Sequence, residues 1–217
     1  TPAIMVSCSF ACTLAFMYLV PQELQRGLGM SSTLAGLLML PGGIVNAVCT
    51  LMAGRLFDRH GARVLVWIGV VMAAIGGALF FAIGVDSGVV LFLAAHIIVM
   101  VGIPFIQQSA QSAALKSLPG RMAADGSTIL NTMQQVCGAI ATAVATCLLG
   151  LGQTGYAAGG GANAAQGFVD GSRYGYMFGL VLVAIVLVFS FMLKGGKEEP
   201  KLVPVQVDDG AVESLAV

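Results

Sequence analysis

Charged side chains are scarce in this sequence, since Lys, Arg, Asp and Glu make up only 9% of its 217 residues. About a quarter of the residues of an average soluble domain are charged, so this shortage excludes an ordinary soluble globular protein. Ten basic and ten acidic residues cancel to a net charge of zero, which argues against a nucleic-acid partner. Hydrophobic residues account for 58% of the chain. The composition therefore predicts a protein that lies largely within a membrane.

Sequence motifs of common enzymes and metal sites are also missing. The chain has no His-Glu-x-x-His or Cys-x-x-Cys sequence, no paired carboxylates and no Ser with a plausible neighbouring base. All five cysteines fall in long apolar segments, where small packing residues are commoner than disulfides or metal ligands. The sequence therefore predicts no cofactor and no metal, and a membrane enzyme is the weakest of its possible functions.

Long apolar segments recur along the chain. A helix needs about 20 apolar residues to cross a bilayer core of about 30 Å, and residues 64–85 provide them without one polar side chain. We predict an all-α membrane protein with six transmembrane helices in residues 1–193, followed by a disordered cytoplasmic tail, residues 194–217. The Gly- and Ala-rich residues 152–172 are expected to form a flexible outer loop. The six predicted spans are residues 3–21, 33–53, 64–85, 88–110, 127–151 and 174–193.

Basic residues are concentrated on one side of this predicted bundle. Eight follow the second, fourth and sixth spans, and two lie on the opposite side. Because cytoplasmic loops are enriched in Lys and Arg, this bias predicts that both chain termini lie in the cytoplasm. The eight are Arg55, Arg59, Arg63, Lys116, Arg121, Lys194, Lys197 and Lys201, and the two are Arg26 and Arg173.

The densest charge in the first half of the chain lies between the second and third spans, in residues 54–63. Gly54 is expected to permit a close helix approach, and Gly61 a tight turn. Asp58 suits the positive amino end of the third span or a neighbouring Arg. We interpret this segment as a gate that holds helix ends together in one conformation and releases them in another. The alternative is a loop whose positive charge only sets the membrane topology. The predicted gating loop comprises Gly54, Arg55, Asp58, Arg59, Gly61 and Arg63.

Polar side chains mark four of the six spans, whereas the third and sixth spans carry few and are expected to face lipid. Asn131, Gln134 and Gln135 share one face of the fifth span. Amides in membrane helices either join helices by hydrogen bonds or line a polar cavity. We favour a cavity for the whole group, because so many amides gather in two helices. The predicted substrate cavity comprises Tyr18, Gln25, Asn46, Gln107, Gln108, Asn131, Gln134 and Gln135.

Ionisable residues are nearly absent from the predicted spans. His96 is the one His among them and is a possible titrating group, since ionisable residues inside membranes are usually functional. The alternative is a neutral His that hydrogen bonds between helices. No Asp or Glu lies deep within any predicted span, so the sequence predicts no coupling carboxylate in this chain.

Several motifs, taken in order, resemble those of one transporter family. Residues 54–63 resemble the G-x-L-x-D-R-x-G-x-R signature that follows the second helix of each half of major facilitator superfamily transporters. Other segments resemble the fourteen-span drug:proton antiporter branch, and the resemblance extends over about residues 1–193. Residues 18–25, 28–31 and 35–43 are similar to its ninth and tenth helices, and residues 126–127 and 131–143 to its thirteenth.

The resemblance implies that this chain is the C-terminal six-helix half of a plasma-membrane exporter of small, often amphipathic compounds. Such a half consists of two three-helix repeats. The implied partners are a small-molecule substrate, membrane lipid, protons as the coupling ion and the N-terminal half. The chain begins at Thr1 without a Met, and we expect it to be part of a longer protein. A non-transporting six-span scaffold and a homodimeric half-transporter stay open as alternatives.

Overall fold

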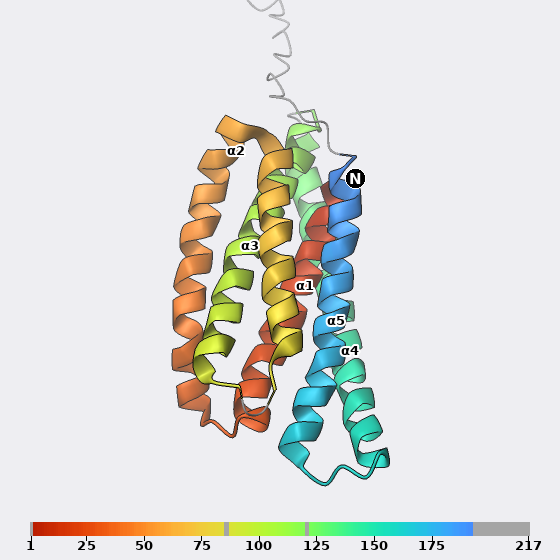
Figure 1. Ribbon diagram of the computed structural model, residues 1–217. Coiled ribbons are helices and arrows are strands. Elements are labelled where there is room, and N and C mark those ends of the chain that lie inside the picture. The colour runs from red at the N-terminus through yellow and green to blue at the C-terminus, as the bar shows by residue number, and fades with distance from the viewer. Residues whose placement is uncertain (1, 85–86, 120–121, 193–217) are drawn as a thin grey trace, which may run out of the picture.

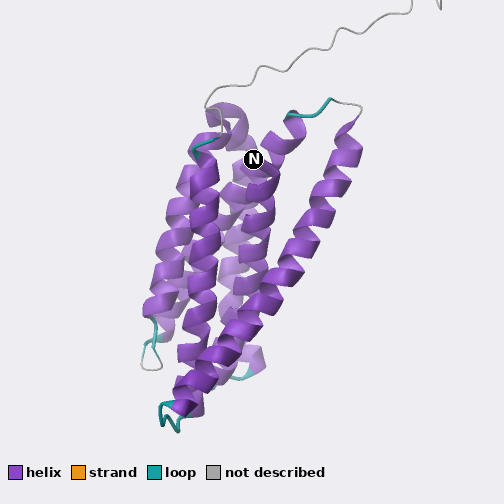
Figure 2. Cartoon of the chain, turned by 90° about the vertical axis from the view of Figure 1, so that its right-hand side faces the viewer, coloured by secondary structure: helices purple, strands orange, loops and turns teal. Residues whose placement is uncertain are grey.

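The computed structural model describes residues 2–84, 87–119 and 122–192, so the predicted tail and its lysines lie outside the described residues. Within these ranges the chain is a bundle of long helices without strands (Figures 1 and 2). Each α-helix is long and apolar enough to cross a membrane. The elements are α1 (Pro2–Gln22), the π-helical turn η1 (Glu23–Gly27), α2 (Ser32–Ala82), α3 (Val89–Lys116), α4 (Ala123–Ala158) and α5 (Ala164–Ser190).

The longest helix, α2, contains two membrane-length arms that meet at Gly61. This glycine has a φ of 78° and a ψ of 168°, which a residue with a side chain rarely adopts. The chain reverses there, so that residues 32–60 and 62–82 run in opposite directions (Figure 1). The described residues therefore contain six membrane-length segments, as predicted, and Gly61 is confirmed as the turn between the second and third.

The two ends of the bundle carry different connections. The start of α1, the turn between the two arms of α2, the end of α3, the start of α4 and the last turn of α5 share one end, which we call the turn end (Figure 1). The opposite end, which we call the far end, holds η1 and residues 28–31, 83–84, 87–88 and 159–163. The first described helix thus begins at the turn end and the last one ends there, as an even number of spans requires.

At the far end, α4 and α5 are longer than predicted. Residues 152–172 are mostly helical, and only residues 159–163 separate the two helices. Asn163 caps α5, because its Oδ1 accepts hydrogen bonds from the backbone N–H groups of Ala165 at 3.0 Å and Gln166 at 3.3 Å. A Cβ at Gly171 would lie 2.5 Å from the Leu149 carbonyl oxygen, so this glycine permits close contact with α4. The prediction of a flexible loop was wrong, because the small residues here allow helices α4 and α5 to pack closely.

Small residues also bring the second arm of α2 against α3. A Cβ at Gly69 would lie 2.6 Å from the Gly102 carbonyl oxygen, and a Cβ at Gly102 would lie 2.6 Å from the Ala73 nitrogen. Helix backbones approach this closely only where no side chain stands between them, which is typical of contacts between membrane helices. The third span is therefore anchored in the bundle through one face.

The six membrane segments are buried to different degrees within the described bundle. The third and sixth spans each bury one face, including Val66, Phe80 and Tyr176. The first arm of α2 buries only Ala35, Gly42, Cys49 and Ala53 among residues 32–60. Helix α4 buries a single stripe, consisting of Gly126, Leu130, Gln134, Gly138, Ala141, Ala145, Leu149 and Gly152. The third and sixth spans also keep exposed apolar side chains, such as Ile68 and Val181, so their lipid-facing role stays a prediction.

Candidate functional site

Asp58, in the predicted gating loop, pairs with the last turn of α3 at the turn end. Its Oδ1 accepts a hydrogen bond from Lys116 Nζ at 3.1 Å, and the same Nζ lies 4.4 Å from the centre of the Phe57 ring. Lys116 is neither of the two predicted partners, which were the amino end of the third span and a neighbouring Arg. The side chains of Asp58 and Lys116 stay 72% and 50% exposed, and ion pairs at such exposure contribute only about 0.2–1 kcal/mol. The pair therefore biases the position of these helix ends but does not lock it.

The remaining loop residues make fewer contacts. Arg55, Arg59 and Arg63 are exposed and form no ion pair within the described part of the chain. A Cβ at Gly54 would meet nothing within 4 Å, so no described helix makes the close approach predicted there. The exposed surface of the first arm of α2 explains this, because no described helix covers that side of Gly54.

Amides from α3 and α4 meet in a chain of hydrogen bonds, the amide bridge, formed by Gln107, Gln134 and Asn131. Gln107 Nε2 donates to Gln134 Oε1 at 3.2 Å, and Gln134 Nε2 donates to Asn131 Oδ1 at 3.4 Å. Gln134 is only 4% exposed, whereas Asn131 and Gln135 lie on the exposed side of α4. The bridge joins two helices that otherwise barely touch. Gln134 therefore orients its neighbours, and among the described residues the Asn131 Nδ2 and the Gln135 amide have no hydrogen-bond partner.

Other predicted cavity residues are engaged elsewhere. Asn46 Nδ2 donates to the Met100 carbonyl oxygen at 3.4 Å and so ties the first arm of α2 to α3. Gln25, at the far end, accepts a hydrogen bond from Ser32 Oγ at 2.9 Å. Tyr18 and Gln108 are half-buried, and their side chains have no hydrogen-bond partner among the described residues. The structure thus brings together three of the eight predicted residues.

His96 belongs to α3, is 4% exposed, and faces the first arm of α2. Its imidazole packs on Gly42, where any side chain would collide with the ring. Its Nδ1 is buried without a partner in the described ranges. The ring borders a narrow apolar pocket, lined also by Val20, Leu24, Leu38, Met39, Val89, Phe92 and Leu93. A titrating role for His96 stays a prediction.

A buried carboxylate at the far end was missed. Glu23, two residues beyond the predicted first span, is 1% exposed, so it is buried within the bundle although the sequence indicated no carboxylate deep within a span. The polar pair Gln22-Glu23 ended the predicted first span, but the helix continues through Pro21 into η1. There the Leu28 N–H donates to the Glu23 carbonyl oxygen at 3.0 Å, five residues back. From α5, Tyr176 Oη donates a hydrogen bond to Glu23 Oε2.

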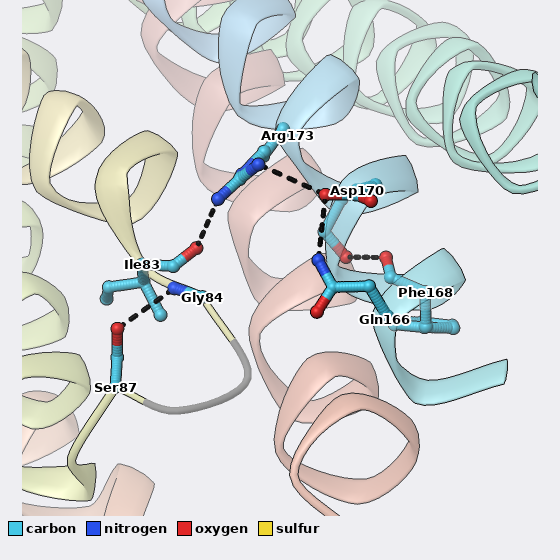
Figure 3. Close-up of polar contacts among 8 residues, drawn as sticks. Ile83, Gly84, Ser87, Gln166, Phe168, Asp170 and Arg173 are labelled. Carbon is cyan, nitrogen blue, oxygen red and sulfur yellow. Dashed lines mark hydrogen bonds and ion pairs between the residues drawn. The ribbon is translucent and has the colours of Figure 1, made fainter. Parts of the chain in front are cut away.

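Arg173, one turn before Tyr176 on α5, joins this region to the end of α2 (Figure 3). Its Nη1 donates to Asp170 Oδ1 at 3.0 Å, and its Nη2 donates to the Ile83 carbonyl oxygen at 3.4 Å. Gln166 Nε2 donates to the same Asp170 oxygen at 3.2 Å. Glu23, Asp170, Arg173 and Tyr176 form what we call the far-end cluster. Its pattern is not visible in the sequence, because Glu23 and Tyr176 are 153 residues apart.

Comparison with known proteins places these features in a family. The family model described as Major Facilitator Superfamily matches residues 1–142. The lincomycin resistance protein LmrB of Listeria monocytogenes is 36% identical over 200 residues, which cover 89% of this chain and 42% of the relative. LmrB of Bacillus subtilis is 35% identical over 196 residues, with 88% and 41% covered. The multidrug resistance protein B homolog of Mycobacterium tuberculosis is 29% identical over 133 residues, with 60% and 25% covered. The chain thus spans less than half the length of these relatives.

Proposed function

Because the chain belongs to the Major Facilitator Superfamily, we propose that it forms the C-terminal half of a secondary active transporter that exports small, amphipathic, drug-like compounds. The similarity to lincomycin resistance proteins over 89% of the chain carries this proposal. The partner is an N-terminal half, and protons moving inward drive the export. The chain itself is a multi-pass membrane protein with six membrane-length segments in its described residues.

The geometry of the amides supports a substrate cavity at the exposed side of α4. Asn131 and Gln135 lie on that side, and the buried Gln134 holds Asn131 and Gln107 in place. Pockets for drug-sized molecules are mostly apolar with a few placed polar groups. The apolar surface of α4 around these amides, with Ile129, Met133 and Val136 exposed, has this composition. An N-terminal half that covers this side would complete the cavity.

We further propose that the turn end faces the cytoplasm of a cell whose plasma membrane holds the protein. Among the basic side chains of residues 2–84, 87–119 and 122–192, Arg55, Arg59, Arg63 and Lys116 belong to segments at this end, and Arg26 and Arg173 lie toward the other. Cysteines introduced at Ala162 and Ser117, in a variant without its own cysteines, test the orientation in whole cells. A membrane-impermeant maleimide should label the Ala162→Cys protein alone, and the reverse result would contradict the proposal.

The export proposal is tested with the complete transporter in inside-out vesicles. A proton gradient, acidic inside, should drive accumulation of a fluorescent cationic dye, because the vesicle interior corresponds to the outside of the cell. A protonophore should abolish the accumulation, and lincomycin should compete with the dye. Accumulation that needs ATP and ignores the protonophore would exclude a proton-driven transporter.

The Asp58–Lys116 pair supports alternating access with a modest bias. Loss of an exposed pair worth about 0.2–1 kcal/mol changes a two-state equilibrium by roughly 1.4- to 5-fold. We therefore expect Asp58→Asn to lower the turnover of the complete transporter by about two- to fivefold and to leave the dye Kd unchanged. Asp125→Asn, in the first turn of α4 at the same end, is the matched control. Turnover equal to that of the control, or a changed dye Kd, would contradict a gating role.

A further inference from the structure

We propose that the surface where the second arm of α2 meets the end of α5, at the turn end, binds one anionic phospholipid. The phosphate pairs with Arg63, and the glycerol region packs against the rings of Trp67 and Phe191. We call these three residues the Arg63 surface. This inference goes beyond the proposed export function, because a lipid site here needs neither a substrate nor a proton gradient.

An aromatic contact joins the two helices at this place. Trp67, on the second arm of α2, lies edge-on to Phe191, the residue that follows α5. The ring centroids are 4.9 Å apart, and the ring planes cross at 89°. Phe191 stays 57% exposed, and Trp67 is partly exposed. Tryptophan is enriched where a membrane meets water, so this pair suits the boundary between the headgroups and the hydrocarbon core.

Arg63 lies at the depth that a lipid phosphate would occupy. It stands four residues before Trp67, on the same helix face and nearer the turn end. A rise of about 1.5 Å per residue separates the two by roughly 6 Å along the helix axis. The headgroup region of a bilayer is about 5–8 Å thick on each side of the hydrocarbon core. With Trp67 at the inner boundary of this region, the guanidinium of Arg63 therefore reaches the phosphates.

No acidic side chain of the neighbouring segments competes for Arg63. Residues 62–82 and 171–192 contain neither Asp nor Glu. Asp58 is already paired, and Asp125 belongs to the first turn of α4. Arg63 itself is exposed and forms no ion pair within the described part of the chain. Because guanidinium groups bind phosphate oxygens strongly and often through two parallel hydrogen bonds, a lipid phosphate is a fitting partner.

Apolar side chains continue the surface farther from the turn end. Val71, one turn beyond Trp67 on the same helix face, is 48% exposed, and Val188, about one turn before Phe191, is 64% exposed. Charge, aromatic rings and branched apolar side chains thus follow one another away from the turn end. A phospholipid presents its phosphate, glycerol and acyl chains in the same order. Free phosphate would use only the first part of this surface, so the whole lipid fits it better.

The charge of this region favours an anionic lipid over a zwitterionic one. Arg55 and Arg59 are also exposed near the turn between the arms of α2, so the positive group of a phosphatidylcholine would be repelled there. One basic residue near an anionic membrane surface favours binding by roughly fivefold. With the turn end toward the cytoplasm, as proposed above, the surface lies in the leaflet that holds most anionic lipid.

The test uses Trp67, the one Trp of residues 1–217, as the probe. The complete transporter, with any other Trp replaced by Phe, is placed in lipid nanodiscs that contain a phospholipid with brominated acyl chains, which quench a Trp on contact. We expect half-maximal quenching at a mole fraction about fivefold lower for brominated phosphatidylglycerol than for brominated phosphatidylcholine. Arg63→Gln should abolish this difference. Arg55→Gln, which removes the same charge from the first arm of α2, should retain it.

Several results would overturn the inference. Equal quenching by the two lipids in the parent, or an unchanged difference in Arg63→Gln, would show that Arg63 selects no lipid. The same loss in Arg55→Gln would indicate a general attraction by the charge of the turn end. No quenching by either lipid would mean that protein covers the surface.

The parent decides the matter if Arg63→Gln does not fold. Quenching that saturates at a low mole fraction of brominated phosphatidylglycerol, and that unbrominated phosphatidylglycerol but not phosphatidylcholine reverses, supports the site. Quenching that grows in proportion to the mole fraction of either lipid overturns it. These measurements need no transport, so a failure of dye export would contradict the proposed function and leave the lipid site intact.

Discussion

Residues 1–217 expressed alone should give no measurable drug export, whereas co-expression with the N-terminal half should restore it. The first arm of α2 buries only four residues, and α4 buries one stripe, so each leaves a broad side without a protein partner. Asn131 and Gln135 lie on that open side of α4, which would supply only one wall of a substrate cavity. Efflux of a fluorescent cationic dye from a drug-sensitive bacterial host measures the difference.

The comparison requires equal amounts of the chain in the membrane with and without its partner, checked with an epitope tag. Export by residues 1–217 alone would favour the homodimeric half-transporter, since a second copy would then cover α4 and the first arm of α2. Restoration by the N-terminal half would favour a two-half transporter. No export in either case, with both halves inserted, would leave the scaffold as the better explanation.

Gln134→Leu should weaken dye binding to the complete transporter by about tenfold. The substitution removes both bonds of the amide bridge and leaves Gln107 Nε2 and Asn131 Oδ1 without their partner. A hydrogen bond of this kind contributes about 0.5–1.5 kcal/mol, and 1.4 kcal/mol corresponds to a tenfold change in Kd. Because Gln134 orients the amide of Asn131, the range of compounds bound should change as well. Fluorescence titration with a panel of cationic and neutral compounds measures both effects.

Gln166→Leu is the matched control for this prediction. It removes an amide that hydrogen bonds Asp170 at the far end of α5, away from the amide bridge. The control should retain the parental dye Kd. If Gln134→Leu lowers thermal stability but also retains the parental Kd, the amides only join α3 to α4, and the cavity lies elsewhere.

Local features of the chain were predictable to different degrees. Six apolar segments and the turn at Gly61 could be read from the sequence, because hydropathy and the need for a positive φ belong to one segment at a time. The predicted ends of these segments were less accurate than their number. The first span was ended at Gln22-Glu23, and the sixth was begun at residue 174, since polar and glycine residues lower the apolar signal even within a buried helix.

Partners in the candidate sites could not be derived in the same way. The sequence showed that Asn131, Gln134 and Gln135 share a helix face, but not that Gln134 is the buried one that bonds Gln107. It placed Asp58 among three arginines, and the structure paired it with Lys116, 58 residues away. Helical periodicity relates residues on one helix, whereas these contacts depend on which helices become neighbours.

The sequence by itself determined the class of this protein, its six membrane segments and its family motifs. These follow from the cost of placing charges and unpaired backbone groups in a bilayer, which acts on each segment separately. Only the tertiary structure decided that Glu23 is buried against Tyr176, that Arg173 binds Asp170 and Ile83, and that the third and sixth spans are packed on one face. Those outcomes depend on close packing between helices, where small residues such as Gly69, Gly102 and Gly171 set the spacing and a carboxylate that looked terminal is enclosed.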